Sequence, residues 1–283
     1  MNKIEAIGGQ AVIEGVMMKS ADRVAIAVRL PNKKIKTKVE RLRKLRRFWR
    51  LPVIRGFVQL ILILIIGIKA LSWSADQQLG KDEKIGAGGL TLTLALSFCF
   101  AVLLFVVCPF FIAKLIIEKG ILFNLIDGII RIAMFIAYIA IISQIKDIKT
   151  LFRYHGAEHK TVNCYEAKKR LTIKNIKKFS TLHPRCGTAF LLIVFIVSIL
   201  IFSLIRGAWQ IRLISRIILI PLVAGISYEI LKITDRYRNS AAAKIISAPG
   251  LALQKLTTAE PDEKQIEVAV CALKNIIKNR SKS

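Results

Sequence analysis

Acidic residues are scarce in this chain of 283 residues. It has 18 Asp and Glu against 45 Lys and Arg, which gives a formal net charge of +27. No recognisable nucleic-acid-binding module accompanies this basic excess, so we do not expect a nucleic-acid partner. The basic residues instead follow the apolar segments along the chain, and this distribution favours contact with anionic lipid headgroups.

Cysteines are also few, and the N-terminal residues do not suggest a secretory leader. The five cysteines are an odd number without the spacing of a disulfide framework, which excludes a disulfide-rich secreted domain and fits a reducing compartment. No apolar core follows the first lysine, so the N-terminus does not resemble a signal peptide.

Apolar residues, in contrast, are abundant. They make up 54% of the chain, and the mean hydropathy of +0.52 is too high for an ordinary soluble domain. A short uncharged run, Gly56–Ile68, has only 13 residues, a length typical of an interfacial or re-entrant helix. Four further segments are long enough to cross a bilayer: 90–112, 121–144, 187–205 and 213–231.

The segments outside these runs carry weaker patterns. Val24–Leu30 and Lys33–Val39 are β-rich and flank Pro31-Asn32, which predicts a hairpin with one polar face. The basic stretch 33–55 has apolar residues at helical spacing, which predicts an amphipathic helix on an acidic leaflet. Near the C-terminus, a proline followed by acids predicts a helix over 261–279 that offers an apolar face to a partner surface.

Together these patterns predict an all-α membrane bundle of about four transmembrane helices, with an interfacial or re-entrant helix and a small N-terminal β element. Lys and Arg number eleven in 33–55, eleven in 146–186 and ten in 232–283. The positive-inside rule therefore predicts that these three regions and both termini are cytoplasmic. The expected divisions are a glycine-rich segment and hairpin (1–40), a basic and interfacial helix (41–71), two pairs of transmembrane helices (90–144 and 187–231), a cytoplasmic histidine-containing loop (145–186) and a cytoplasmic tail (232–283).

All three histidines of the chain fall in the loop 146–186. In a helix, His155 and His159 lie one turn apart on one face, where two imidazoles can bind one metal. Their pattern, H-x-x-E-H, is that of inverted metalloproteases, in which the glutamate, here Glu158, is the general base. The motif does not fix a third ligand. The candidates are His183, Cys186, Glu14 and Glu166.

Each of these residues also has a structural interpretation. The His/Glu cluster can be a hydrogen-bonded network that only stabilises the fold. Cys186 can be a small residue beside a tight approach at Gly187, and Arg185 can be a charge that flanks a span or a group that binds an anionic substrate.

Four blocks of the sequence, residues 8–18, 69–72, 152–160 and 182–188, resemble the signature blocks of the YqhQ-like family, in the family's order. The resemblance implies a bacterial protein embedded in the cytoplasmic membrane, of unknown function and predicted to be a metal-dependent enzyme. The His, Glu and Cys residues of the family's blocks correspond here to Glu14, His155, Glu158, His159, His183 and Cys186.

Two functional hypotheses follow. The first is a metal-dependent hydrolase at the cytoplasmic membrane surface, in which a divalent transition metal, best Zn²⁺, lowers the pKa of a bound water toward about 7. The second is a scaffold or assembly factor with a closed, four-ligand structural metal site, acting with a membrane protein partner or a second copy of itself. Transport is disfavoured because the ligand set lies outside the spans and no interrupted helix pair is evident.

Overall fold

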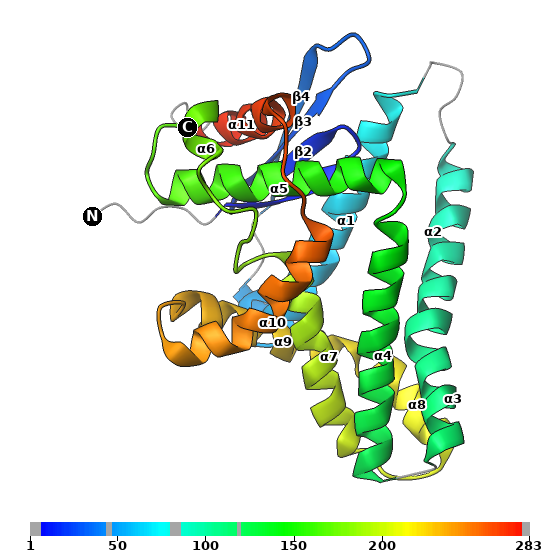
Figure 1. The fold of residues 1–283 in the computed structure, drawn as a ribbon. Helices are drawn as coiled ribbons and strands as arrows, with labels where there is room; N and C mark the ends of the chain where they lie inside the picture. The colour runs from blue at the N-terminus through cyan, green and yellow to red at the C-terminus, as the bar shows by residue number, and fades with distance from the viewer. Residues whose placement is uncertain (1–6, 44–46, 80–85, 118–119, 279–283) are drawn as a thin grey trace.

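The computed structural model describes residues 7–43, 47–79, 86–117 and 120–278. A small antiparallel sheet and the helices that cover it form one end of the molecule, and a group of apolar helices forms the other (Figure 1). Helix α5 lies across the end of α4, between the sheet and the apolar helices.

The sheet is a meander of four antiparallel strands in the order β1-β2-β3-β4. The predicted hairpin is confirmed as β3 (Arg23–Arg29) and β4 (Ile35–Arg41). The glycine-rich segment adds a second hairpin, β1 (Gly8–Val12) and β2 (Gly15–Lys19), which the sequence analysis did not predict.

Both faces of β3 are buried, which explains its nearly continuous apolar sequence. Val24, Ile26 and Val28 on one face pack against α1, and Ala25 and Ala27 on the other face pack against α11. Because successive strand residues point to opposite faces, one strand serves two cores. The small alanines leave room for the helix on their side.

The helices follow in chain order, and their bounds set the frame for the site. They are α1 (Ile54–Asp76), α2 (Ala87–Val102), a π-helical turn (Leu103–Val107), α3 (Cys108–Ile116), α4 (Ile121–Ile142), α5 (Lys146–Glu166), α6 (Ile173–Ile176), α7 (Gly187–Ser203), α8 (Trp209–Ile218), α9 (Ile220–Arg236), α10 (Ala241–Thr257) and α11 (Glu263–Lys278).

Three helical stretches are long and apolar enough to cross a membrane, namely Ile54–Asp76, Gly88–Ile116 and Ile121–Ile142. The bent pair α8–α9 raises this number to four if the pair is one span. The second and third stretches match the predicted segments 90–112 and 121–144. The predicted segment 187–205 is α7, an apolar helix of 17 residues.

Two predictions about the helices need correction. The apolar run Gly56–Ile68 belongs to a helix of 23 residues, because α1 continues past Lys69 where Ala70 and Ser74 are buried against the sheet side. The predicted segment 213–231 is not one straight helix, since α8 and α9 meet at an angle of 53°. Pro221, at the start of α9, has no backbone N–H to continue the helix from α8.

The predicted amphipathic helix in the stretch 33–55 is wrong in the part that the structure describes. Residues Ile35–Arg41 form strand β4, and Arg47–Arg50 form a single 3₁₀ turn. Residues 44–46 lie outside the described residues. Lys alternates with Ile, Thr and Val in the first part of this stretch, which allows it to pair with β3. This strand pairing outweighs the helical spacing of the apolar residues further along the stretch.

The tail helix is confirmed as α11, but its apolar face is already occupied. Ile266, Ala269 and Leu273 are buried in the cluster that joins the sheet to α5. The partner surface predicted for this helix is therefore the chain's own sheet and α5.

Among the apolar helices, a buried ionic network joins α4 to α8. Asp127 of α4 accepts hydrogen bonds from Arg131 at 3.1 Å and from Arg216 at 2.8 Å. Arg216 also donates to the side-chain oxygen of Asn124 at 3.1 Å. Charged groups in apolar surroundings are stabilised only when they are paired, so the network fixes α8 against α4.

Candidate functional site

Helix α5 carries both histidines of the predicted pair. The ring centroids of His155 and His159 lie 4.4 Å apart, as expected for residues one helical turn apart on one face. His155 Nδ1 lies 2.8 Å from the carbonyl oxygen of Thr257, and His159 Nδ1 lies 2.5 Å from that of Thr181. A carbonyl oxygen only accepts hydrogen bonds, so each Nδ1 is the protonated nitrogen and each Nε2 keeps its lone pair free to bind a metal.

Cys186 completes a group of three possible ligands. Its Sγ atom lies 3.3 Å from His155 Nε2, and one donor atom from each of His155, His159 and Cys186 lies within 4.8 Å of the other two. Donors around one Zn²⁺ lie roughly 3.3–3.8 Å apart, because Zn–N and Zn–S distances are about 2.1 and 2.3 Å. The group is therefore close to the size that one zinc ion requires.

His183 is buried beside this group but is not part of it. Its ring centroid is 5.8 Å from that of His159, and its Nε2 faces a carboxylate oxygen of Glu166 at 3.7 Å. Gln254 of α10 fixes the backbone of His183 with two hydrogen bonds, accepting from its N–H at 2.8 Å and donating to its carbonyl oxygen at 2.9 Å.

Glu14 also lies apart from the three donors. It occupies the turn between β1 and β2 with a positive φ of 50°, and its carboxylate accepts a hydrogen bond from the hydroxyl of Tyr154 at 3.1 Å. Burial, together with the charge of Glu14, raises the pKa of the Tyr154 hydroxyl well above its ordinary value. Glu14 therefore links the first hairpin to α5.

Glu158 is the buried carboxyl group next to the three donors. One of its oxygens lies 3.4 Å from His159 Nε2, and the residue is 3% exposed. Burial raises the pKa of its carboxyl group above the ordinary value, although His155, His183 and Arg185 act in the opposite direction. A carboxyl group with a raised pKa accepts a proton more readily near neutral pH, as a general base requires.

Strand β1 lies against Glu158 because of a glycine. A Cβ atom at Gly9 would lie 2.9 Å from Glu158 Cγ, so a side chain here would displace the glutamate. This close approach brings the glycine-rich segment against α5, within the region 146–186.

Glu166 forms the polar margin of the site. Its carboxylate binds Arg185, and it accepts a hydrogen bond from Arg238 at 3.1 Å. Burial alone would raise the pKa of Glu166, but the interactions with His183, Arg185 and Arg238 outweigh burial and lower its pKa to about 2. Arg185 also lies 3.8 Å from Asp235, so carboxylates of the protein itself balance its charge.

The end of α10 and the segment after it were not recognised from the sequence. Thr257 orients His155, and the backbone N–H of Ala259 donates to the carbonyl oxygen of Phe152 in α5 at 3.0 Å. The sequence did contain one sign of this contact, because Gln254 is an amide within an apolar helix. The structure buries Gln254 completely. Its partner, the backbone of His183, is 71 residues away and leaves no mark in the sequence.

Gly156 makes the contact between α5 and this segment possible. A Cβ atom at position 156 would lie 2.0 Å from the carbonyl oxygen of Ala259. Helix propensity favours alanine over glycine by roughly 1 kcal/mol in a helix interior. Glycine at position 156 is therefore explained by the space that the contact needs, and not by helix formation.

We expect Gly156→Ala to lower the free energy of unfolding by about 1–3 kcal/mol, as overpacking against backbone does. The control is Gly88→Ala in α2, where a Cβ atom meets nothing within 4 Å. This control should be neutral or stabilise by up to about 1 kcal/mol, because only helix propensity changes. Thermal unfolding of both variants in detergent is the measurement, and a Gly156→Ala protein as stable as the control would contradict the contact.

Two comparisons place the chain among known proteins. A family model described as a protein of unknown function (DUF1385) matches residues 51–279. The uncharacterized protein YqhQ of Bacillus subtilis (strain 168) is 35% identical over 294 residues, which cover 96% of this chain and 92% of the relative. No solved structure matches the chain. The resemblance seen in the sequence blocks is thus confirmed, and the chain belongs to the YqhQ-like DUF1385 family of unknown function.

Proposed function

We propose that this protein is a metal-dependent hydrolase that acts at the cytoplasmic surface of the bacterial membrane. The observation that carries the proposal is the convergence of His155, His159 and Cys186, whose donor atoms lie within 4.8 Å of one another. The hydrogen bonds from both Nδ1 atoms to backbone carbonyls support it further, because metal-binding histidines are commonly oriented in this way.

Zn²⁺ is the metal that these residues fit best. Two imidazole nitrogens and one thiolate are common zinc ligands, and three protein ligands leave one position of a tetrahedral site open. An open position favours catalysis over a structural role, since structural zinc sites are closed by four protein ligands. When bound, the metal supplies a Lewis acid that makes water a nucleophile near neutral pH.

In this proposal Glu158 accepts the proton from the attacking water. The carboxyl group lies beside His159 and is held in place by β1 at Gly9, so it needs little rearrangement to act. Burial excludes bulk water from this carboxyl group, and the raised pKa makes it the stronger base.

The membrane position follows from the apolar helices and the basic residues. Helix α4 leads into α5, and α7 begins directly after Cys186, so one end of both apolar helices meets the site (Figure 1). The basic regions 33–55, 146–186 and 232–283 favour the cytoplasm for this end. We therefore assign both termini and the site to the cytoplasmic side, and the α7–α8 connection to the other side. This assignment requires that α1, which packs against the sheet, does not cross the bilayer.

Cysteine labelling in intact cells tests this topology. A reporter at Ala208→Cys, in the α7–α8 connection, should react with an impermeant thiol reagent. A reporter at Lys174→Cys in α6 should react only after the cells are made permeable, because the proposal puts it in the cytoplasm. Both positions are exposed in the structure. The reverse pattern of labelling would rule out the proposed orientation.

Metal analysis tests the ligand set. Protein purified without chelator should hold about one zinc per chain, and His155→Ala, His159→Ala and Cys186→Ala should each lose it, because each removes one of three ligands. The matched variant is His183→Ala, which removes a neighbouring histidine that faces Glu166 and should keep the metal. A metal-free wild type, or a Cys186→Ala protein that keeps its metal while His183→Ala loses it, would refute the assignment.

Substitution of Glu158 separates an enzyme from a structural metal site. Glu158→Gln keeps the shape of the side chain and removes the proton acceptor, so an enzyme should keep its metal and melting temperature. Its activity should fall by about 10²–10⁴-fold, the usual contribution of a general base. Complementation of a strain that lacks the gene reports activity while the substrate is unidentified. Full complementation by metal-loaded Glu158→Gln protein would instead favour the scaffold hypothesis.

A further inference from the structure

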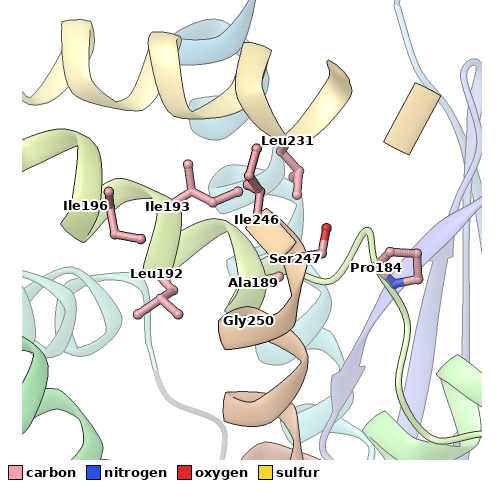
Figure 2. A pocket seen from close by; sticks show the side chains of 9 residues that line it. All are labelled: Pro184, Ala189, Leu192, Ile193, Ile196, Leu231, Ile246, Ser247 and Gly250. Carbon is pink, nitrogen blue, oxygen red and sulfur yellow. The ribbon is translucent and has the colours of Figure 1, made fainter. Parts of the chain in front are cut away.

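One side of helix α10 is packed against its neighbours. Gly250 lies so close to α7 that a Cβ atom there would be 2.7 Å from Ala189 Cβ. Figure 2 shows Ile246 of α10 and Leu231 of α9 on the same pocket, which has a volume of about 10 Å³. A space of this size holds about one water molecule, so this side of α10 is closed by α7 and α9.

The opposite side of α10 is apolar and exposed. It carries four exposed residues, namely Ile245, Pro249, Ala252 and Leu256. Their spacing of four, three and four residues puts them on one face of the helix, which we call the outer face of α10. Ile245 is 72% exposed and Leu256 is 40% exposed. An exposed apolar face of this kind is typical of a surface that contacts a membrane or another protein.

The charged residues of α10 are all positive, which decides between these two partners. The helix contains no Asp or Glu, and its two lysines, Lys244 and Lys255, are exposed near its two ends. A second copy of the chain would bring the same cations to a shared twofold interface, where like charges repel one another. An anionic leaflet suits this face better, because acyl chains accept its apolar residues and phosphates attract its lysines.

A segment far away in the sequence exposes aromatic residues close to α9, the helix beside α10. Phe48 and Trp49, in the turn before α1, are 59% and 44% exposed. This turn is held near α9, because a Cβ atom at Gly225 would lie 2.5 Å from a side-chain carbon of Val53. Tyr237, directly after α9, is 57% exposed. Trp and Tyr are enriched where a bilayer meets water, so these residues are typical of a protein surface at that level.

We infer that α10 anchors the protein in the cytoplasmic leaflet, with its outer face among the acyl chains and Lys244 and Lys255 at the phosphates of anionic lipids. The inference rests on the proposed function for the side of the membrane. Helix α10 lies beside the start of α7 (Figure 1), and the proposed function places α7 in the bilayer. The region 232–283, expected to be a cytoplasmic tail, is then attached to the leaflet along α10.

The anchor also sets the height of the candidate site. The carbonyl oxygen of Thr257, the last residue of α10, accepts the hydrogen bond that orients His155. Gln254, one turn earlier, binds the backbone of His183. Because both contacts come from the last turn of α10, a helix held at the headgroups holds the three donors close to the headgroups as well.

The test puts the photocrosslinker p-benzoylphenylalanine in place of Ile245 or Leu256 in the full-length protein, in vesicles of phosphatidylethanolamine and phosphatidylglycerol. After illumination, mass spectrometry should find lipid adducts at both positions about as often as at Phe98, which is 66% exposed on a candidate span. The probe at Lys174, exposed in the region assigned to the cytoplasm, should give about tenfold fewer. Adducts as rare as at Lys174, or crosslinked dimers in place of lipid adducts, would overturn the inference.

Substitution of the two lysines tests the preference for anionic lipid. With the probe at Ile245, phosphatidylglycerol should be captured about fivefold more often than its share of the bilayer, and Lys244→Glu with Lys255→Glu should abolish this preference. The matched control, Lys169→Glu with Lys178→Glu, makes the same change of charge at two exposed lysines outside α10 and should keep it. A preference that persists in the α10 variant, or that both variants lose equally, would refute the assignment of anionic lipid.

Metal content, measured on the same samples, reports on the proposed function separately. Metal-loaded protein without lipid adducts on α10 would refute the anchor alone. Metal-free protein with lipid adducts on α10 would refute the metal centre and support the anchor without it.

Discussion

The candidate site depends on two backbone carbonyls that fix the direction of two imidazoles. The carbonyl oxygens of Thr181 and Thr257 accept hydrogen bonds from His159 and His155. The Nε2 atom of His155 thereby faces Cys186 at 3.3 Å, and that of His159 lies 3.4 Å from Glu158. These carbonyls come from chain segments before α7 and at the end of α10, so neither helix can shift without moving the donors. Gly156 allows α5 to come close enough for both contacts, because any larger residue would meet the backbone of Ala259.

Features that arise from local spacing could be predicted from the sequence. The β-rich run Val24–Leu30 and the alternation in Lys33–Val39 give β3 and β4, and the four-residue spacing of His155 and His159 gives two rings on one face of α5. The acids after Pro261 mark the start of α11 in the same way. In each case the pattern lies within one element, and the tertiary structure reinforces the local preference.

Features that depend on distant packing could not be predicted. The sequence left Cys186, His183, Glu14 and Glu166 as candidates for a third ligand, and only the fold separates Cys186, beside His155, from the other three. The length of α1 was missed because the charge of Lys69 suggested that the apolar helix ends there. The helix continues, and Ala70 and Ser74 beyond Lys69 are buried. Gln254 was missed because its partner is the backbone of a residue far away in the chain.

The break between α8 and α9 bears on the hypothesis of transport, which the sequence disfavoured partly because it showed no interrupted helix. The structure has such an interruption, but Arg216 beside it is already bound to side chains of α4. Arg216 of α8 binds Asp127 and Asn124 of α4, and the aromatic rings of Phe110 and Phe202 lie about its guanidinium group at 4.7 and 5.0 Å. A broken helix serves transport when its free backbone groups line a substrate site, whereas here the ion pair holds α8 against α4. Within the part of the chain that the structure describes, the donor atoms that converge as metal ligands would belong to His155, His159 and Cys186, at the other end of α7, where the apolar helices meet the sheet (Figure 1). A centre at that level suits chemistry on a molecule held in the bilayer more than passage of a molecule through it.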